Sequence, residues 1–381
     1  MAKYDLYPEI KIDQYSGAWR GYPQIAEEIK KYRKKKKTVI AIESYIGVHN
    51  EEIKTNLVNA LCPEFVVFAD DLAFDGDTIT KMVKRNLTDD RVFGVMSHQT
   101  LDEFYDQQKL TEARKQVEEA EGLTVVYGTG ASLVAKPDIL IYADLARWEC
   151  QCRYRAGETN WKVSNAQEDP LKKNKRGYFF EWRICDRRKE ELYDQIDFLL
   201  DTNTSDDPKM VSGDDYRYGL SLAVRQPFRL VPYFDASVWG GQWMKEKFCL
   251  DPNADNFGWA FDGVPEENSL YLRYGDVRIE VPALNLVRQY PNELLGAKVH
   301  SRFGKEFPIR FDFLDTMEGG NLSLQVHPLT EYIQEQFGMH YTQDESYYIL
   351  DAKEDAAVYL GVKEDVNMED MVEDLKKAQA E

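Results

Sequence analysis

Short apolar runs alternate with amphipathic stretches through residues 38–225. The runs are rich in β-branched and aromatic residues, which favours strands, and they cover residues 38–42, 65–69, 91–95, 123–127 and 138–142. Between them lie stretches with helical spacing. One covers residues 51–60, and another begins at a capping box of Thr100 and Glu103 and reaches about Ala120. Strands that alternate with helices predict an α/β fold, with a parallel sheet covered on both faces.

The flanking segments set the predicted domain organisation. A helix from about Tyr22 ends in the basic block of residues 30–37, where cations complement the helix dipole. Residues 157–225 are rich in charged and aromatic residues with little periodicity, and we interpret them as a helix-rich lid or connecting segment with a loop at residues 203–209. Since 381 residues exceed the usual size of one domain, we expect an α/β domain over residues 1–225 and a β domain over residues 226–381.

A different pattern marks the region after residue 320. Gln325 and His327 stand two apart in an apolar run, so on a strand their side chains point to the same face, and Glu345 opens a second apolar run. Three nitrogen and oxygen donors on neighbouring strands can hold a divalent metal inside a barrel. The alternative is a polar pair and a separate glutamate on half-buried strands. Farther on, residues 357–360 predict a strand and residues 367–381 a helix with an apolar packing face.

These residues belong to an ordered series of short motifs. The series comprises Trp-Gly-Gly at 239–241, Leu-Leu-Gly at 294–296, Phe-Gly-Lys-Glu-Phe-Pro at 303–308, Leu-Ser-Leu-Gln-Val-His-Pro at 322–328 and Glu-Ser-Tyr-Tyr-Ile-Leu at 345–350. It resembles the motifs of the type I mannose-6-phosphate isomerases, a metal-dependent cupin family. The resemblance says nothing about residues 1–225.

The resemblance implies a cupin jelly-roll barrel that interconverts mannose 6-phosphate and fructose 6-phosphate. By position it implies that Gln325, His327 and Glu345 bind Zn²⁺ or another divalent metal. It also implies that Ser323 meets the substrate phosphate, although a small strand residue is an equal explanation. The family's fourth ligand is a histidine in the second half of the barrel, and no histidine follows His340. We therefore expect a truncated barrel, with an aspartate, a water or His340 itself as alternative fourth ligands.

Two positions depart from the family pattern. The family has a lysine two residues before the ligand glutamate, where this chain has Gln343, which cannot do acid–base chemistry. A second family lysine, near the phosphate site, corresponds to Asp312. Arg310, on the same strand face, is a candidate replacement cation for a hexose phosphate. We expect an isomerase-like protein whose catalytic residues are unassigned and which is inactive as this chain if the barrel is truncated. The alternative is a non-catalytic sugar-phosphate-binding or regulatory protein.

The α/β domain resembles the nucleoside-kinase type of P-loop fold, because its first strand runs into the loop where a phosphate cradle would lie. That loop, residues 43–52, contains only Gly47 and lacks a Gly-Lys-Ser/Thr ending. Glu51 and Glu52 would repel a triphosphate. We therefore expect a degenerate kinase-like domain that does not hydrolyse ATP.

Three further features of this domain have two interpretations each. Asp70-Asp71 matches an acidic position of the kinases or forms an exposed turn. Gly128-Thr129-Gly130 is a weak phosphate-loop signal or a tight turn. The three arginines after the fifth apolar run line an anion site or cover a charged helix face; they are Arg147, Arg153 and Arg155.

Net charge, apolar runs and cysteine content limit the kinds of partner and the cellular compartment that we expect for this protein. A net charge of −19 argues against nucleic acid as a partner. No apolar run is long enough to span a bilayer, so we expect no membrane partner. The five cysteines form an odd set in a core-rich chain, which predicts reduced thiols and a cytoplasmic protein. We expect the chain to form a homodimer.

Overall fold

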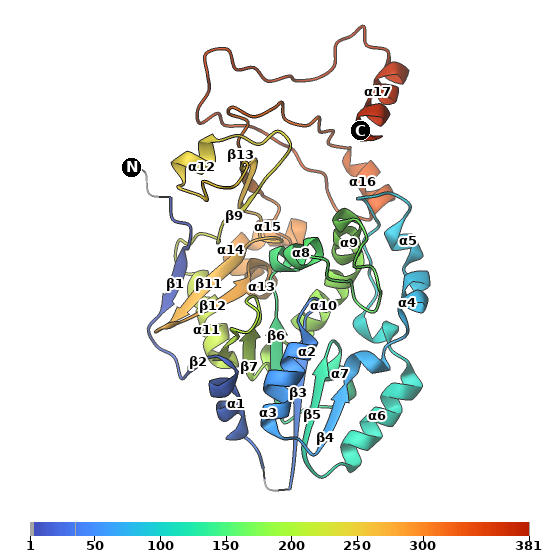
Figure 1. The fold of residues 1–381 in the computed structure, drawn as a ribbon, viewed down its shortest axis with the longest axis vertical. Coiled ribbons are helices and arrows are strands. Elements are labelled where there is room, and N and C mark those ends of the chain that lie inside the picture. The colour runs from blue at the N-terminus through green and yellow to red at the C-terminus, as the bar shows by residue number, and fades with distance from the viewer. Residues whose placement is uncertain (1–3, 35, 381) are drawn as a thin grey trace. The chain divides into compact units, whose positions relative to one another are not determined.

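The computed structural model describes residues 4–34 and 36–380, and it divides the chain into two compact units, Met1–Gln343 and Asp344–Glu381. In its described part, the first unit is a mixed α/β structure with three open sheets (Figure 1). Each unit is described by itself below.

A seven-stranded sheet forms the centre of the first unit. Its strands, in spatial order, are β2 (Ala18–Arg20), β8 (Lys209–Ser212), β7 (Phe198–Asp201), β6 (Ile139–Asp144), β3 (Lys37–Ser44), β5 (Gly122–Gly128) and β4 (Phe65–Phe68). The strands from β7 to β4 run parallel, while β8 and β2 add an antiparallel edge. The predicted mostly parallel sheet is thus confirmed.

Four of the five predicted parallel strands are confirmed, and the prediction for residues 91–95 is wrong. Asp90 accepts hydrogen bonds from the N–H groups of Val92 and Phe93, and Asn86 exchanges backbone and side-chain hydrogen bonds with Val95. These local bonds hold the apolar run in a loop, because they take the backbone groups that a strand would pair. The fifth parallel strand is β7, which lies in the segment predicted to be a helical lid.

The helical segments of the α/β region connect these strands. They are α1 (Tyr22–Lys30), α2 (Asn50–Ile53), η1 (Lys54–Val58), α3 (Asn59–Leu61), η2 (Ala69–Leu72), α4 (Gly76–Met82), α5 (Lys84–Leu87), η3 (Leu101–Phe104), α6 (Gln107–Glu119), α7 (Ala131–Val134), α8 (Arg147–Arg155), α9 (Pro170–Arg176), η4 (Gly177–Glu181), α10 (Trp182–Leu192), η5 (Tyr193–Gln195) and α11 (Gly213–Ala223). The predicted capping box of Thr100 and Glu103 is present, but it begins the short η3. Asp106 caps the long helix α6 instead.

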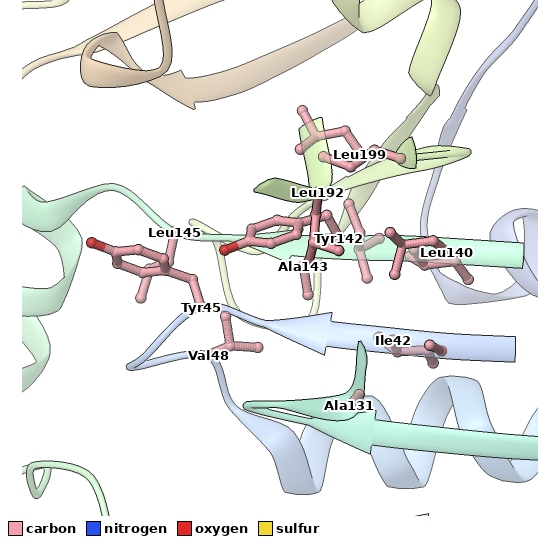
Figure 2. Packing of buried hydrophobic residues seen from close by; sticks show 14 of the residues in the cluster. Ile42, Tyr45, Val48, Ala131, Leu140, Tyr142, Ala143, Leu145, Leu192 and Leu199 are labelled. Carbon is pink, nitrogen blue, oxygen red and sulfur yellow. The ribbon is translucent and has the colours of Figure 1, made fainter. Parts of the chain in front are cut away.

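The main hydrophobic core lies on the parallel strands. Almost every residue of β3, β5 and β6 is buried, as expected for strands covered on both faces. Figure 2 shows Ile42 of β3, Leu140 of β6 and Leu199 of β7 among the packed side chains, together with Leu192 of α10.

Two smaller sheets follow in the first unit. One contains β1 (Glu9–Ile12), β11 (Ser269–Tyr274) and β12 (Val277–Pro282), and the other β9 (Tyr233–Asp235), β10 (Trp259–Gly263) and β13 (Phe311–Leu314). Strand β1 pairs in parallel with β11, far along the chain (Figure 1). Leu270, Leu272, Ile279 and Val281 join the main core. The helices of this part are α12 (Trp243–Lys247), α13 (Ala283–Gln289), α14 (Pro291–Leu295), α15 (Ala297–Phe303) and α16 (Thr330–Phe337). The domain boundary after residue 225 stays a prediction.

Residues 322–328, 345–350 and 357–360 are irregular, so the strands predicted there are wrong for this structure. A β-strand needs a hydrogen-bonded neighbour, and none of the described strands pairs with these segments. In the second unit the predicted C-terminal helix is confirmed as α17 (Met368–Ala380), which Asn367 caps through its side-chain oxygen. None of the helices within the described residues is long and apolar enough to cross a membrane.

Matched valines test the position of the core. Val125 on β5 is fully buried, whereas Val238 is fully exposed. Val125→Ala removes buried methyl groups from the packed core and should lower the free energy of unfolding by about 2 kcal/mol. Val238→Ala should change it by less than about 0.5 kcal/mol. Urea unfolding measures both, and equal effects would contradict the assigned core.

Candidate functional site

Polar residues end three of the parallel strands at one edge of the sheet. β3 ends at Ser44, β6 at Asp144 and β7 at Asp201. β3 and β6 are neighbours, but the chain continues from β3 to β4 and from β6 to β7, which lie on opposite sides of this pair. Ligands of open α/β sheets bind outside the carboxyl ends of the strands at such a switch point. This edge is therefore the first place to seek a ligand site.

The loop after β3, predicted as a degenerate phosphate loop, is packed with side chains. Tyr45, Ile46 and Val48 are buried. Gly47 has a φ of 93°, and a Cβ atom there would lie 3.0 Å from a methyl carbon of Leu145. The glycine thus permits a close approach between two loops of the protein, in the place where a phosphate cradle would need open space.

The loop after β3 presents a carbonyl oxygen to Arg153, whereas a phosphate cradle presents N–H groups to an anion. Arg153 Nη1 donates to the carbonyl oxygen of Gly47 at 2.6 Å, and its Nη2 donates to the carbonyl oxygen of Thr202 at 2.9 Å. A phosphate cradle presents N–H groups to an anion. Here a carbonyl oxygen faces a buried cation.

Two carboxylates occupy the N–H groups of the Gly128-Thr129-Gly130 turn. Asp70 Oδ2 accepts from the Thr129 N–H at 3.0 Å, and Glu43 accepts from the Gly130 and Ser132 N–H groups, both at 2.7 Å. The side chains of the protein therefore take the place that an anion would occupy. Asp70 is buried, so the exposed-turn interpretation is wrong for this residue.

Burial dominates the electrostatics of this pair of carboxylates. It raises the pKa of Asp70 to about 6, although hydrogen bonds from the Trp161 indole and the Thr129 N–H favour the charged form. Burial also raises the pKa of Glu43. Asp70 consequently titrates in a weakly acidic range in which an exposed aspartate is already ionised.

The three arginines of α8 each have a carboxylate partner. Arg147 pairs with Asp186, Arg153 with Glu149 at 2.9 Å, and Arg155 with Asp235 at 2.7 Å. Arg147 and Arg153 are buried, so they do not form the charged surface considered from the sequence. The predicted anion site loses its support, because each positive charge is neutralised within the protein.

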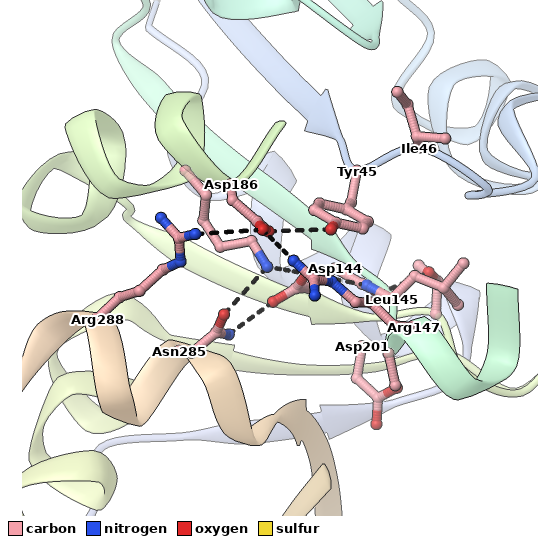
Figure 3. A network of polar contacts seen from close by, with 12 residues as sticks. Tyr45, Ile46, Asp144, Leu145, Arg147, Asp186, Asp201, Asn285 and Arg288 are labelled. Carbon is pink, nitrogen blue, oxygen red and sulfur yellow. Dashed lines mark hydrogen bonds and ion pairs between the residues drawn. The ribbon is translucent and has the colours of Figure 1, made fainter. Parts of the chain in front are cut away.

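A buried polar network lies between the sheet edge and helices α10 and α13 (Figure 3). Asp186 of α10 accepts from Arg147, from the Tyr45 hydroxyl at 3.0 Å, and from Arg288 of α13 at 3.4 Å. One carboxylate thus connects the loop after β3 with α8, α10 and α13.

The second half of the network is centred on Asp144. Lys189 Nζ donates to Asp144 Oδ1 at 2.6 Å and to Asn285 Oδ1 at 3.1 Å. Asn285 Nδ2 donates to Asp144 Oδ2 at 2.8 Å. Both ends of the Lys189–Asp144 ion pair are almost fully buried.

Charge pairing decides the protonation state at the centre of the network. Burial by itself would raise the pKa of Asp186, but the guanidinium groups of Arg147 and Arg288 hold this pKa well below its usual range. Asp186 is therefore ionised at neutral pH. Since its charge is matched by buried cations, the network holds helices against the sheet and offers no free acid or base.

The predicted metal ligands lie on irregular segments. Ser323, Gln325 and His327 are exposed in the first unit, and Glu345 is exposed in the second unit. Within residues 4–34 and 36–380, no group of three His, Cys, Asp or Glu side chains is arranged to hold a metal ion.

Two other predicted residues each have a carboxylate partner in the first unit. Arg310 Nη2 is 3.6 Å from Glu266 Oε1, and His340 Nδ1 is 3.3 Å from Glu306 Oε1. Burial and the charges of Glu306 and Glu266 raise the pKa of Tyr341, the residue after His340. A cation, a histidine and a phenol are the kinds of groups that bind a phosphorylated sugar.

Sequence reasoning singled out Arg147 but missed its partners in the buried network, Asp144, Asp186 and Lys189. Asp144 ends an apolar run and so looks like the beginning of a turn. Asp186 and Lys189 lie in a helix with many charges, whose other members are mostly exposed or half-buried. Their spacing of three residues would put them on one helix face, but it does not indicate that this face is buried.

The fold and this edge define a mixed α/β protein with a mostly parallel sheet whose carboxyl edge is filled by its own side chains. Over residues 21–225 the sequence matches the model of a family described as a domain of unknown function (DUF8485), and the chain belongs to that family. A search of curated proteins found no match.

Asp70 supplies a pH test of the carboxylate-filled turn. Between pH 4 and pH 6 the unfolded chain loses the Asp70 proton while the folded protein keeps it, because the folded pKa is raised to about 6. The stability of the wild-type protein relative to Asp70→Asn should therefore fall by about 3 kcal/mol over this range and stay constant above it. Urea unfolding of both proteins as a function of pH measures the difference. A difference that does not change with pH would rule out the raised pKa.

The Arg147–Asp186 pair supplies a test of the network. Arg147→Met leaves a buried carboxylate without its main cation and should cost about 3–5 kcal/mol of stability. Lys115→Met, which breaks an exposed pair with Glu119, should cost less than about 1 kcal/mol. Chemical unfolding of both variants checks the contrast, and a cost below about 1 kcal/mol for Arg147→Met would show that the pair is not essential.

Proposed function

We propose that residues 226–381 belong to a metal-dependent cupin domain of the mannose-6-phosphate isomerase type, and that the DUF8485 region is a P-loop-kinase-like domain without nucleotide chemistry. The substrate class is a hexose phosphate, and the metal is Zn²⁺ or another divalent ion. The proposed ligands are Gln325, His327 and Glu345. We also propose that the protein is cytoplasmic and homodimeric.

One packing arrangement carries this proposal. The Gly241 N–H donates to the Asp315 carbonyl oxygen at 2.8 Å, and the Gly320 N–H donates to the Trp239 carbonyl oxygen at 3.0 Å. A Cβ atom on Gly241 would lie 2.2 Å from Asp315 Oδ1, so the two chain segments require a residue without a side chain. The Trp-Gly-Gly motif thus packs on the segment that leads directly into Ser323, Gln325 and His327. Two motifs distant in sequence form one structural unit, which supports reading them as one family signature.

The same segments offer groups of the required chemistry. Imidazole nitrogen together with glutamine and glutamate oxygens is a donor set that suits Zn²⁺. When bound, the metal would stabilise the oxygens of the enediolate that forms when the sugar loses a proton next to its carbonyl group. Arg310, paired with Glu266 at 3.6 Å, would exchange this carboxylate for the phosphate group, and Ser323 supplies a hydroxyl. Gln325 and His327 lie in the first unit and Glu345 in the second, and the proposal assigns no catalytic step to them.

The α/β region supports the second half of the proposal. The loop after β3 is filled by Tyr45, Ile46 and Val48, and Gly47 presents its carbonyl oxygen to Arg153. Glu51 and Glu52 lie in the first turn of α2, where a triphosphate would need positive charge. An active kinase would need all three features to change.

A second candidate function is a non-catalytic sugar-phosphate sensor. Gln343 and Asp312 stand where the isomerases carry lysines, and neither can act as the lysine does. The exposed position of Gln343 leaves room for a ligand contact without acid–base chemistry.

Metal content and turnover distinguish these functions. The purified chain, loaded with Zn²⁺ and then dialysed, should retain zinc and should convert mannose 6-phosphate to fructose 6-phosphate in a coupled assay. Loss of an outer partner of a metal ligand already weakens metal binding by about 10–100-fold, so His327→Ala should weaken zinc binding at least that much. His98→Ala, at an exposed histidine outside the proposed site, is the matched control.

Each outcome of this experiment has a distinct meaning. No retained zinc in the wild-type chain would refute the metal site. Zinc without turnover, together with saturable binding of mannose 6-phosphate, would favour the sensor. Turnover that His327→Ala abolishes and His98→Ala preserves would exclude the sensor.

A further inference from the structure

His49 joins three loops at the carboxyl edge of the parallel sheet. It lies directly before α2, in the loop that follows β3. Its Nε2 is 2.6 Å from Oε1 of Glu158, in the segment after α8. Its Nδ1 is 3.3 Å from the Ser205 hydroxyl, in the loop between β7 and β8, and 3.6 Å from Glu52 Oε2. We call these four residues the His49 cluster.

Glu52 extends the cluster to a fourth element. Its Oε1 accepts a hydrogen bond from the Tyr22 hydroxyl of α1 at 2.6 Å and from the backbone N–H of Asp206 at 2.9 Å. The carboxylate is therefore held in place from two sides. Its position next to His49 does not depend on the histidine.

The connectivity of Ser205, His49 and Glu158 is that of a nucleophile, a base and an acid that orients the base. The second carboxylate argues against that role. His49 lies between Glu158 and Glu52, and the hydrogen bond with Glu158 raises the pKa of His49 despite its partial burial and the nearby Arg153. A raised pKa favours the charged ring, which cannot accept the proton of a serine, so the cluster is better suited to holding the loops together than to catalysis.

We propose that the His49 cluster is a pH-dependent latch: protonated His49 ties the loop after β3 to the segment after α8 and to the β7–β8 loop, and loss of its proton weakens these ties. Both nitrogens of the imidazolium donate, one to Glu158 and the other toward Ser205 and Glu52. The neutral ring keeps one N–H group and one acceptor nitrogen. It can therefore still bridge Glu158 and the Ser205 hydroxyl, but the bond to Glu158 loses its charge assistance and Nδ1 no longer donates toward Glu52. Arg153 binds the same loop after β3 through the Gly47 carbonyl oxygen, so the latch and Arg153 both hold this loop.

The charged groups around His49 set the direction of the response. Glu158 and Glu52 favour the charged ring, and Arg153 opposes it. Asp206 contributes its backbone N–H to Glu52 and not to the histidine. Because the pKa of His49 is raised in the folded protein, the stabilisation is complete below the pKa of His49 in the unfolded chain, about 6.5. It is lost as the pH rises through the folded value.

Hydrogen exchange of the full chain tests the latch. Amide protection of peptides that cover residues 45–50, 157–162 and 202–208 would be measured by mass spectrometry at pH 6.0 and pH 8.5, after correction for the intrinsic exchange rate. In the wild-type protein, protection should fall several-fold at the higher pH in all three segments together. Peptides from β5 should keep their protection and serve as an internal reference.

Variants make the test specific. His49→Gln and Glu158→Gln should each show at pH 6.0 the low protection that the wild type shows at pH 8.5, with no further pH dependence. His98→Gln should behave like the wild type. Glu158 is about 39% exposed, so its variant keeps the test usable even where His49→Gln unfolds the protein. Protection that is independent of pH in the wild type, or a pH response that survives both variants, would overturn the proposal.

Discussion

Charge pairing at the carboxyl edge of the parallel sheet is the constraint on which the rest of the structure depends. Parallel strands covered on both faces end inside the protein, so the polar residues at their ends must find partners there. Lys189 forms an ion pair with Asp144, and Arg147 forms an ion pair with Asp186. Since the partners come from α8, α10 and α13, the same pairs that neutralise the edge also fix the helices against it.

At the same edge, side chains of the protein occupy the backbone groups that a bound ligand would otherwise contact. In an open α/β sheet this is where a bound anion normally meets N–H groups. In this protein the carboxylates of Glu43 and Asp70 meet them, and Arg153 meets a carbonyl oxygen. In the DUF8485 region these contacts stabilise the edge of the sheet with the protein's own side chains. In the residues that follow this region, the Trp-Gly-Gly motif and the segment before His327 pack as one unit.

The sequence predicts those features whose cause is local. The uninterrupted apolar runs of β3 and β6 are typical of strands buried on both faces, and they were found. Residues 91–95 are also mostly apolar, but Asp90 and Asn86 hydrogen-bond to their backbone groups. Whether such local bonds form depends on the three-dimensional positions of the side chains, which the sequence alone does not give. Residues 322–328 alternate as a strand does, yet pairing needs a neighbour supplied from elsewhere. For the site, Asp186 looks like any charged residue of a surface helix until the helix is placed against the sheet.

The pairing of β1 with β11 has a consequence for the order of folding. Glu9 lies opposite Tyr271, so β1 leaves the ribosome long before its partner strand has been made. Contacts between residues so far apart in sequence close large loops and form late. The parallel sheet, whose strands lie close together in the chain, can assemble while β1 is still unpaired. During synthesis the protein therefore passes through a period in which an apolar strand edge is open, and this is the interval in which a chaperone would matter most.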